Sequence, residues 1–270
     1  MLNFLNHYHR LFILIILISI SIFSWFYTIA GVGMNMSAWK MTLINLNLIS
    51  HSNSMEFMEY KKTYDIFLNL TFLFLMWFFM MIAMMLPSVI PFVMMFQKIN
   101  EERKKFQYKY AATTNFVLSY LLVWGLFSLI VTMLHYFLEI YNVLNTNTLS
   151  VGYVFGGVLF ILAGIYQMTP YKDSCLHYCR NPIELLSSNK IFTNQGAFFI
   201  GFKHGIFCIG CCWMLMLLLF YAGIMNIFWI VGLSFYIIIE KYFFQNNKFN
   251  LISGFILIFW GIRIFYVNLS

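Results

Sequence analysis

Long apolar stretches, separated by short polar connections, follow one another along most of the chain. Seven of them are expected to form helices, at residues 11–32, 66–96, 111–137, 151–168, 205–222, 226–244 and 251–267. About 20 apolar residues are needed to cross the hydrocarbon layer of a bilayer. The sixth stretch is apolar only over residues 227–239, so it must recruit its flanks to span. The pattern predicts an all-α fold, a polytopic transmembrane helical bundle of about seven spans that forms a single membrane domain over residues 1–270.

The second apolar stretch is too long for one straight span, and Pro87 and Pro91 interrupt its later part. A proline inside a helix removes a backbone donor and crowds the preceding turn, which predicts a kink or a break there. Within a membrane, irregular backbone is tolerated where it is packed in protein or lines a cavity. This helix is therefore expected to face the interior of the bundle.

The first apolar stretch has features of a signal peptide, because basic residues precede it and small residues around Ala30 follow it. Its apolar core is longer than the roughly 7–15 residues that are usual for signal peptides. An uncleaved signal anchor is the favoured interpretation, and cleavage of the first helix is the alternative.

Basic residues gather in the connections that would lie on one side of the membrane. The N-terminus and residues 98–109, 172–203 and 241–248 together carry twelve Lys and Arg, whereas the opposite connections carry three. Cytoplasmic connections hold the excess of Lys and Arg in membrane proteins. This predicts an N-terminus inside and a C-terminus outside, an outside loop at residues 34–64, and a cytoplasmic Cys-containing loop at residues 170–203.

The composition excludes a soluble domain and a nucleic-acid-binding surface. Hydrophobic residues make up 62% of the chain and charged residues 9%, far below the ~25% of charged residues in soluble domains. The net charge of +7 does not indicate nucleic acid, because the basic residues lie between apolar runs and do not cluster on a soluble surface. The expected partner of these basic connections is the lipid bilayer with its anionic headgroups.

A group of metal-binding residue types opens the fifth apolar stretch. In a helix, His204, Cys208 and Cys212 follow one another at i,i+4, and Cys211 lies one turn after Cys208, so all four share one face. Thiolate and imidazole are ligands of Cu(I), Zn(II) and related ions. The alternative is that these cysteines only pack, as small hydrophobic residues. Three thiols within five residues, one turn from a histidine, favour metal binding or redox work.

A second group lies in the preceding connection, on the same predicted side of the membrane. Cys175 and Cys179 would lie one turn apart if this segment is helical, and His177 would then point elsewhere. The two groups together hold all five cysteines of the chain. They offer more donors than a soft ion needs, so one site with exchangeable ligands and two neighbouring sites both stay open.

Methionines and one carboxylate are secondary candidates. Met76, Met80 and Met84 are spaced i,i+4 on the second stretch, with Met81 and Met85 on an adjacent strip. Thioethers are soft, neutral ligands for Cu(I), although a methionine stripe alone more often fills gaps in a core.

Glu240 could orient His204 by accepting its second ring proton, although an ionisable residue at the end of a span is more often an anchor. The secondary candidates are His177, Met80, Met81, Met84, Met85 and Glu240.

Seven blocks of sequence carry a resemblance to a known family. They are Ala83–Pro87, Gly164–Lys172, Cys175–Pro182, Gly201–Gly205, Cys208–Met216, Gly223–Asn226 and Glu240–Lys241. With these blocks the chain resembles the bacterial predicted metal-binding integral membrane proteins filed as domain of unknown function 2182. It departs from that pattern at Ser119, where a glycine is expected. The resemblance implies metal binding, a link to copper delivery, and a multi-pass protein of the bacterial cytoplasmic (inner) membrane, without supplying a mechanism.

The function that these residues favour is the handling of a soft metal ion, with copper(I) as the first candidate and zinc as the second. The expected ligands are Cys175, Cys179, His204, Cys208, Cys211 and Cys212. The ion would cross the membrane or pass to a partner, either a metallochaperone or a metalloenzyme being loaded. Two alternatives stay open. One is a membrane thiol–disulfide oxidoreductase that uses the Cys208-x-x-Cys211 pair, and the other is a structural subunit whose cysteines only pack.

Overall fold

The computed structural model describes residues 2–32, 37–46, 66–102, 109–145, 149–181, 194–243 and 247–269. Within these ranges the chain is almost entirely helical, which confirms the predicted all-α class. Most of the predicted outside loop lies outside the described residues, and so does part of the predicted cytoplasmic loop, at residues 182–193.

Ten helices and one short hairpin make up the described part of the chain. The helices are α1 (Leu2–Ala30), α2 (Ala38–Asn45), α4 (Ile66–Glu102), α5 (Lys109–Ile140), α6 (Tyr153–Gln167), α7 (Pro170–Arg180), α9 (Asn194–Leu217), α10 (Leu219–Ala222), α11 (Ile227–Tyr242) and α12 (Asn247–Leu269). Between α5 and α6, strand β1 (Leu144–Asn145) pairs antiparallel with β2 (Ser150–Val151), with Leu144 opposite Val151.

Five of the seven predicted stretches form helices that are long and apolar enough to cross a membrane. The fourth stretch forms α6, which is followed by α7 at a bend of 65°, and the two together make a sixth candidate span or a re-entrant segment. The sixth stretch forms α11, whose 16 residues extend about 24 Å at 1.5 Å per residue. That is shorter than the ~30 Å thickness of the hydrocarbon layer.

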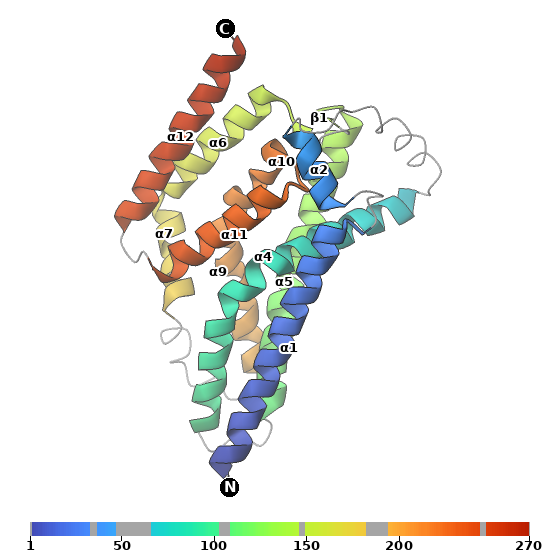
Figure 1. Cartoon of the computed structure of the whole chain (residues 1–270). Coiled ribbons are helices and arrows are strands. Elements are labelled where there is room, and N and C mark those ends of the chain that lie inside the picture. The colour runs from blue at the N-terminus through green and yellow to red at the C-terminus, as the bar shows by residue number, and fades with distance from the viewer. Residues whose placement is uncertain are drawn as a thin grey trace.

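The helices form two groups with connecting elements between them (Figure 1). In one group α1 packs on α4, α4 on α5, and α5 on α9. In the other, α6 packs along α12. Helix α7 lies against α9, and α11 lies against both α4 and α7, so these two shorter helices join the groups. The two chain termini lie at opposite ends of the molecule (Figure 1).

Helix α4 changes direction part-way along its length (Figure 1) and contains both Pro87 and Pro91. Each proline lacks the amide hydrogen that would bond one turn back, which is the usual cause of a kink. The side chains around the prolines are buried, among them Leu86, Val89 and Phe92. One side of the kinked part of α4 therefore faces the bundle interior, where the hydroxyls of Ser234 and Tyr242 donate to main-chain oxygens of α4, while Pro91 itself is exposed.

Close backbone contact joins α6 to α12, and it depends on glycine. A Cβ atom added at Gly164 would lie 2.6 Å from the main-chain oxygen of Gly254. A Cβ atom added at Gly254 would lie 2.8 Å from the main-chain oxygen of Gly164. Neither contact leaves room for a side chain, so small residues set the separation of these two helices.

Helix α7 restarts the chain after the bend, and its sequence explains why. Thr169 caps the helix by accepting a hydrogen bond from the Lys172 amide, and Pro170 occupies the first helical turn, where a missing amide hydrogen costs little. The predicted loop at residues 170–203 is thus helical over Pro170–Arg180, and α9 begins at Asn194, before the predicted start at residue 205. The polar residues at these helix ends made the segment resemble a loop.

Candidate metal centre

Three thiols on α9 are gathered inside the bundle. Cys208, Cys211 and Cys212 are buried, with at most 1% of each side chain exposed. The thiols of Cys211 and Cys212 both donate to the main-chain oxygen of Cys208, at 3.1 and 2.8 Å. Spacings of three and four residues return a helical side chain to the same side. The three sulfurs therefore occupy one side of α9.

Helix α7 brings a fourth thiol to this group. Cys179 is buried, and its side chain lies near those of Cys208 and Cys211. Cys175, one turn earlier, is only half-buried, and its sulfur packs over Gly210, where an added Cβ would lie 2.8 Å from it. All five cysteines are free thiols. The two cysteine groups of the sequence thus meet at the contact of α7 with α9, and we call Cys179, Cys208, Cys211 and Cys212 the thiol cluster.

An ammonium group and a phenol complete the surroundings of Cys208. The Nζ atom of Lys241, on α11, donates to the Cys208 sulfur at 3.1 Å and to the Ser88 hydroxyl at 3.0 Å. The hydroxyl of Tyr120, on α5, lies 3.4 Å from the same sulfur. Lys241 and Tyr120 are both buried. A positive charge beside this sulfur compensates the negative charge that a thiolate would bring into a medium of low dielectric constant.

His204 lies one turn before Cys208 on α9, in an aromatic environment. Its ring centroid is 4.0 Å from that of Phe92, 6.0 Å from that of Phe116 and 5.9 Å from that of Tyr120. The Nδ1 atom of His204 is buried and has no hydrogen-bond partner among the described residues. A buried polar atom without a partner is costly. Because this nitrogen has no protein partner in the described part of the chain, it is free to bind a ligand, which would remove that cost.

The methionines of α4 are buried, and one of them contacts the thiol cluster. Met85 places its sulfur 4.0 Å from the Cys212 sulfur. Met80, Met81 and Met84 are fully buried in the same core. Of the methionines predicted as secondary ligands, Met85 is therefore the one that the structure brings to the thiols.

The donor set suits a soft ion, but the side chains are not drawn together around one point. No group of three or more His, Cys, Asp or Glu side chains within the described ranges is arranged so that it could hold a metal ion as it stands. The thiols of Cys211 and Cys212 are turned back onto their own helix.

Comparison with known families gives this donor set a context. A family model described as "PpoB2: Copper chaperone" matches residues 74–264. The chain belongs to this copper chaperone family. Searches of the curated proteins and of the solved structures gave no match. The family assignment agrees with the link to copper that the sequence resemblance implied.

The region shared with the copper chaperone family contains the thiol cluster and everything packed around it. It includes the later part of α4 with both prolines, all of α7 and α9, and Lys241 on α11. Helices α1 and α2 lie outside it. The family therefore shares the elements that gather sulfur, and these are more interior than α1, of whose apolar span only 22% is buried.

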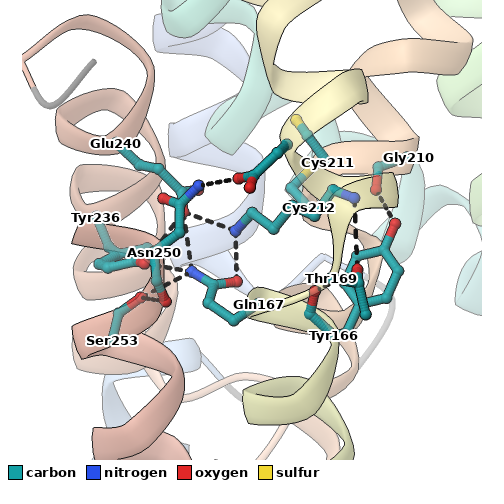
Figure 2. A network of polar contacts seen from close by, with 12 residues as sticks. Tyr166, Gln167, Thr169, Gly210, Cys211, Cys212, Tyr236, Glu240, Asn250 and Ser253 are labelled. Carbon is teal, nitrogen blue, oxygen red and sulfur yellow. Dashed lines mark hydrogen bonds and ion pairs between the residues drawn. The ribbon is translucent and has the colours of Figure 1, made fainter. Parts of the chain in front are cut away.

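Glu240 and His177, both predicted as secondary ligands, lie in other surroundings. The Glu240 carboxylate forms an ion pair with Lys172 at 2.6 Å and accepts hydrogen bonds from Gln167 at 2.8 Å and Tyr236 at 3.2 Å. Figure 2 shows Gln167, Tyr236 and Glu240 pointing toward one another, with Ser253 beside them. His177 is exposed on α7 and contacts Asn181, in agreement with its predicted direction away from the cysteines.

In this copper chaperone family member, sequence reasoning missed Lys241 and Tyr120. Lys241 adjoins Glu240 at the end of an apolar stretch, a place where lysine usually anchors a helix at the membrane surface. Tyr120 lies in an apolar helix with nothing in its neighbourhood that points to sulfur. Only the packing of α5 and α11 around α9 brings both groups to Cys208. The signal that could have drawn attention to Lys241 was its place in a resemblance block.

Proposed function

We propose that this protein is a multi-pass membrane protein that binds Cu(I) at the thiol cluster and passes it to a partner. Cys179, Cys208, Cys211 and Cys212 are the candidate thiolates, two of which would hold the ion at a time, with His204 as a nitrogen donor and Met85 as a neutral thioether donor. Cu(I) prefers soft sulfur ligands. The observation that carries the proposal is the meeting of four buried thiols from α7 and α9 in a chain of the copper chaperone family.

The charges around Cys208 support a monovalent ion. Cu(I) held by two thiolates carries one net negative charge, and the Lys241 ammonium at 3.1 Å from Cys208 would bring the sum to zero. A neutral site costs least to bury where water is absent. Each thiol must lose its proton when the metal binds, so loading would release protons. Zinc would need a third thiolate for the same balance.

The proposed setting is the bacterial cytoplasmic membrane, with the N-terminus inside and the thiol cluster toward the cytoplasmic side. This orientation rests on the distribution of Lys and Arg between the connections. Copper would enter from a metallochaperone or leave to a metalloenzyme being loaded. His177, on the exposed side of α7, lies where a partner could first meet the ion.

Elemental analysis tests this function. The full chain is purified in mild detergent under reducing, oxygen-free conditions and loaded with Cu(I) in competition with a chromogenic Cu(I) chelator. We expect stoichiometric copper in the wild type and its loss in Cys208→Ser/Cys212→Ser. Cys175→Ser, which changes a thiol outside the cluster, is the matched control and should retain copper.

Three results would overturn the proposal. One is a wild type without bound copper, and another is a double variant that keeps the wild-type copper content. The third is stoichiometric zinc in place of copper in protein purified without added metal. Thiol trapping of the same samples separates the oxidoreductase alternative, which requires a disulfide between Cys208 and Cys211 in part of the population.

A further inference from the structure

Helix α7 carries Cys179 to the thiol cluster, although few of its side chains are buried. Of its eleven residues only three are buried, Lys172, Leu176 and Cys179, and they lie along one face at spacings of four and three. Leu176 is the one large aliphatic side chain among them. The half-buried Tyr178 adds a ring that is stacked on Phe207 of α9, with centroids 4.4 Å apart, and polar contacts join α7 to α11.

The strongest of these contacts is the ion pair between Lys172 and Glu240. Both side chains are at most 1% exposed, and their charged atoms are 2.6 Å apart. The Gln167 amide bridges the pair, because its oxygen accepts from Lys172 and its nitrogen donates to Glu240 and to Ser253 of α12. One network thus joins α6, α7, α11 and α12 (Figure 2).

The other end of α7 is attached to the same residue. Arg180 donates from Nη2 to the main-chain oxygen of Glu240 at 2.7 Å. Glu240 therefore holds α7 twice, by its side chain near the start of the helix and by its backbone near the end. Cys179, which adjoins Arg180, lies between α7 and α9 at the end of the buried face.

We infer that the Lys172–Glu240 ion pair is a positioning device for Cys179, which it holds against Cys208 and Cys211. This inference rests on the proposed copper site and deepens it. Burying an ion pair costs free energy, because two charges lose their hydration. Two apolar side chains would avoid this cost, so we expect the pair to have a function beyond stability. The pair ties α7 to α11 and so adds a directional contact to the apolar packing of Leu176 and Tyr178. Lys172 and Glu240 would touch no copper themselves.

The test compares the wild type with Lys172→Met/Glu240→Gln in the full, detergent-purified chain. Removing both charges leaves neither one buried alone, so the double variant is expected to fold. In copper-free protein, alkylation of Cys179 by N-ethylmaleimide, followed by peptide mass spectrometry, should become at least about tenfold faster, while Cys208 stays protected. The affinity for Cu(I) should fall about 10–100-fold, as when groups that orient a metal ligand are removed.

Two further variants separate positioning from general weakening. In a Cys179→Ser background the double change should lower copper affinity no further, because its effect passes through Cys179. The charge-swapped variant Lys172→Glu/Glu240→Lys restores an ion pair. If the Gln167 amide turns over, its nitrogen can donate to the new Glu and its oxygen can accept from the new Lys, so the variant should again protect Cys179 from alkylation. It also serves as the second variant if the neutral one does not fold.

Trp77→Phe, which removes a hydrogen bond to His135 at 3.1 Å in another part of the bundle, controls for mild destabilisation.

Unchanged alkylation of Cys179 in a folded neutral variant would overturn the inference. Additive losses of affinity from Cys179→Ser and the neutral pair would overturn it too, and so would a folded swapped variant with fast alkylation. The alkylation measurement uses copper-free protein. If the wild type binds no copper, the proposed function fails while the position of Cys179 is still measured, so the two failures are distinguishable.

Discussion

Lys172 and Lys241 are both buried, with 0% and 5% of the side chain exposed, but their ammonium groups have different partners. Lys172 faces the Glu240 carboxylate at 2.6 Å. Lys241 faces the Cys208 sulfur at 3.1 Å and the Ser88 hydroxyl at 3.0 Å. In the part of the chain that the structure describes, no carboxylate lies within ion-pair distance of Lys241.

The difference indicates two separate roles for buried charge. A buried cation needs a nearby anion. For Lys172 that partner is a carboxylate of a neighbouring helix, which suits an architectural contact between helices. For Lys241 the neighbouring group is anionic only when Cys208 has lost its proton, as it must when it binds a metal. The environment of Lys241 thus depends on the state of the thiol cluster, and that of Lys172 does not.

The largest expected effect separates the two lysines by stability. Lys172→Met leaves the Glu240 carboxylate buried without its cation, and we expect the free energy of unfolding to fall by about 3–5 kcal/mol. Lys241→Met strands no carboxylate and should cost less than about 1 kcal/mol. Equilibrium unfolding in mixed micelles measures both variants. Equal losses would show that the two lysines have the same structural role and would break the comparison.

The next effect concerns the charge beside the thiol cluster. Lys241→Met removes the charge beside Cys208, and the affinity for Cu(I) should fall about 10–100-fold, measured by competition with a chromogenic Cu(I) chelator. Lys241→Arg keeps the charge on a different shape and should lose less. An unchanged affinity in Lys241→Met would mean that the charge of the Cys208 thiolate is balanced by some other group.

Apolar patterning was a sound guide to the long helices and a poorer one to their ends. α4, α5 and α12 follow the predicted stretches, because a bilayer demands a continuous apolar run whatever the tertiary packing. α9 begins at Asn194, well before the predicted stretch, because apolarity reports immersion in lipid and a helix can continue with polar residues beyond it. The bend between α6 and α7 followed from no apolar signal, although Thr169 and Pro170 marked the helix start.

The thiol cluster was predictable only where its residues are local in sequence. The helical period alone places Cys208, Cys211 and Cys212 on one side of α9. Glu240 and Lys241 are neighbours about 100° apart around α11, so at most one of them can face a given thiol. The sequence favoured Glu240 as the partner of the site, whereas packing against α9 brings Lys241 to Cys208 and turns Glu240 toward Lys172. Such a choice depends on the rotation of one helix about its axis, which adjacent residues do not encode.

The smallest expected effects come from a matched pair of tyrosine changes, one beside each lysine. Tyr236→Phe removes a donor to Glu240, at 3.2 Å, and should lower the free energy of unfolding by about 1–2 kcal/mol without altering copper affinity. Tyr120→Phe removes the hydroxyl 3.4 Å from the Cys208 sulfur. It should weaken copper binding by about threefold to tenfold, equivalent to a hydrogen bond of about 1 kcal/mol. Unfolding and chelator competition are measured on both proteins.

The comparison is sharpened if Tyr236→Phe changes only the free energy of unfolding and Tyr120→Phe changes only the copper affinity. It is lost if Tyr236→Phe lowers copper affinity as much as Tyr120→Phe does, because the two buried charges would then belong to one continuous site.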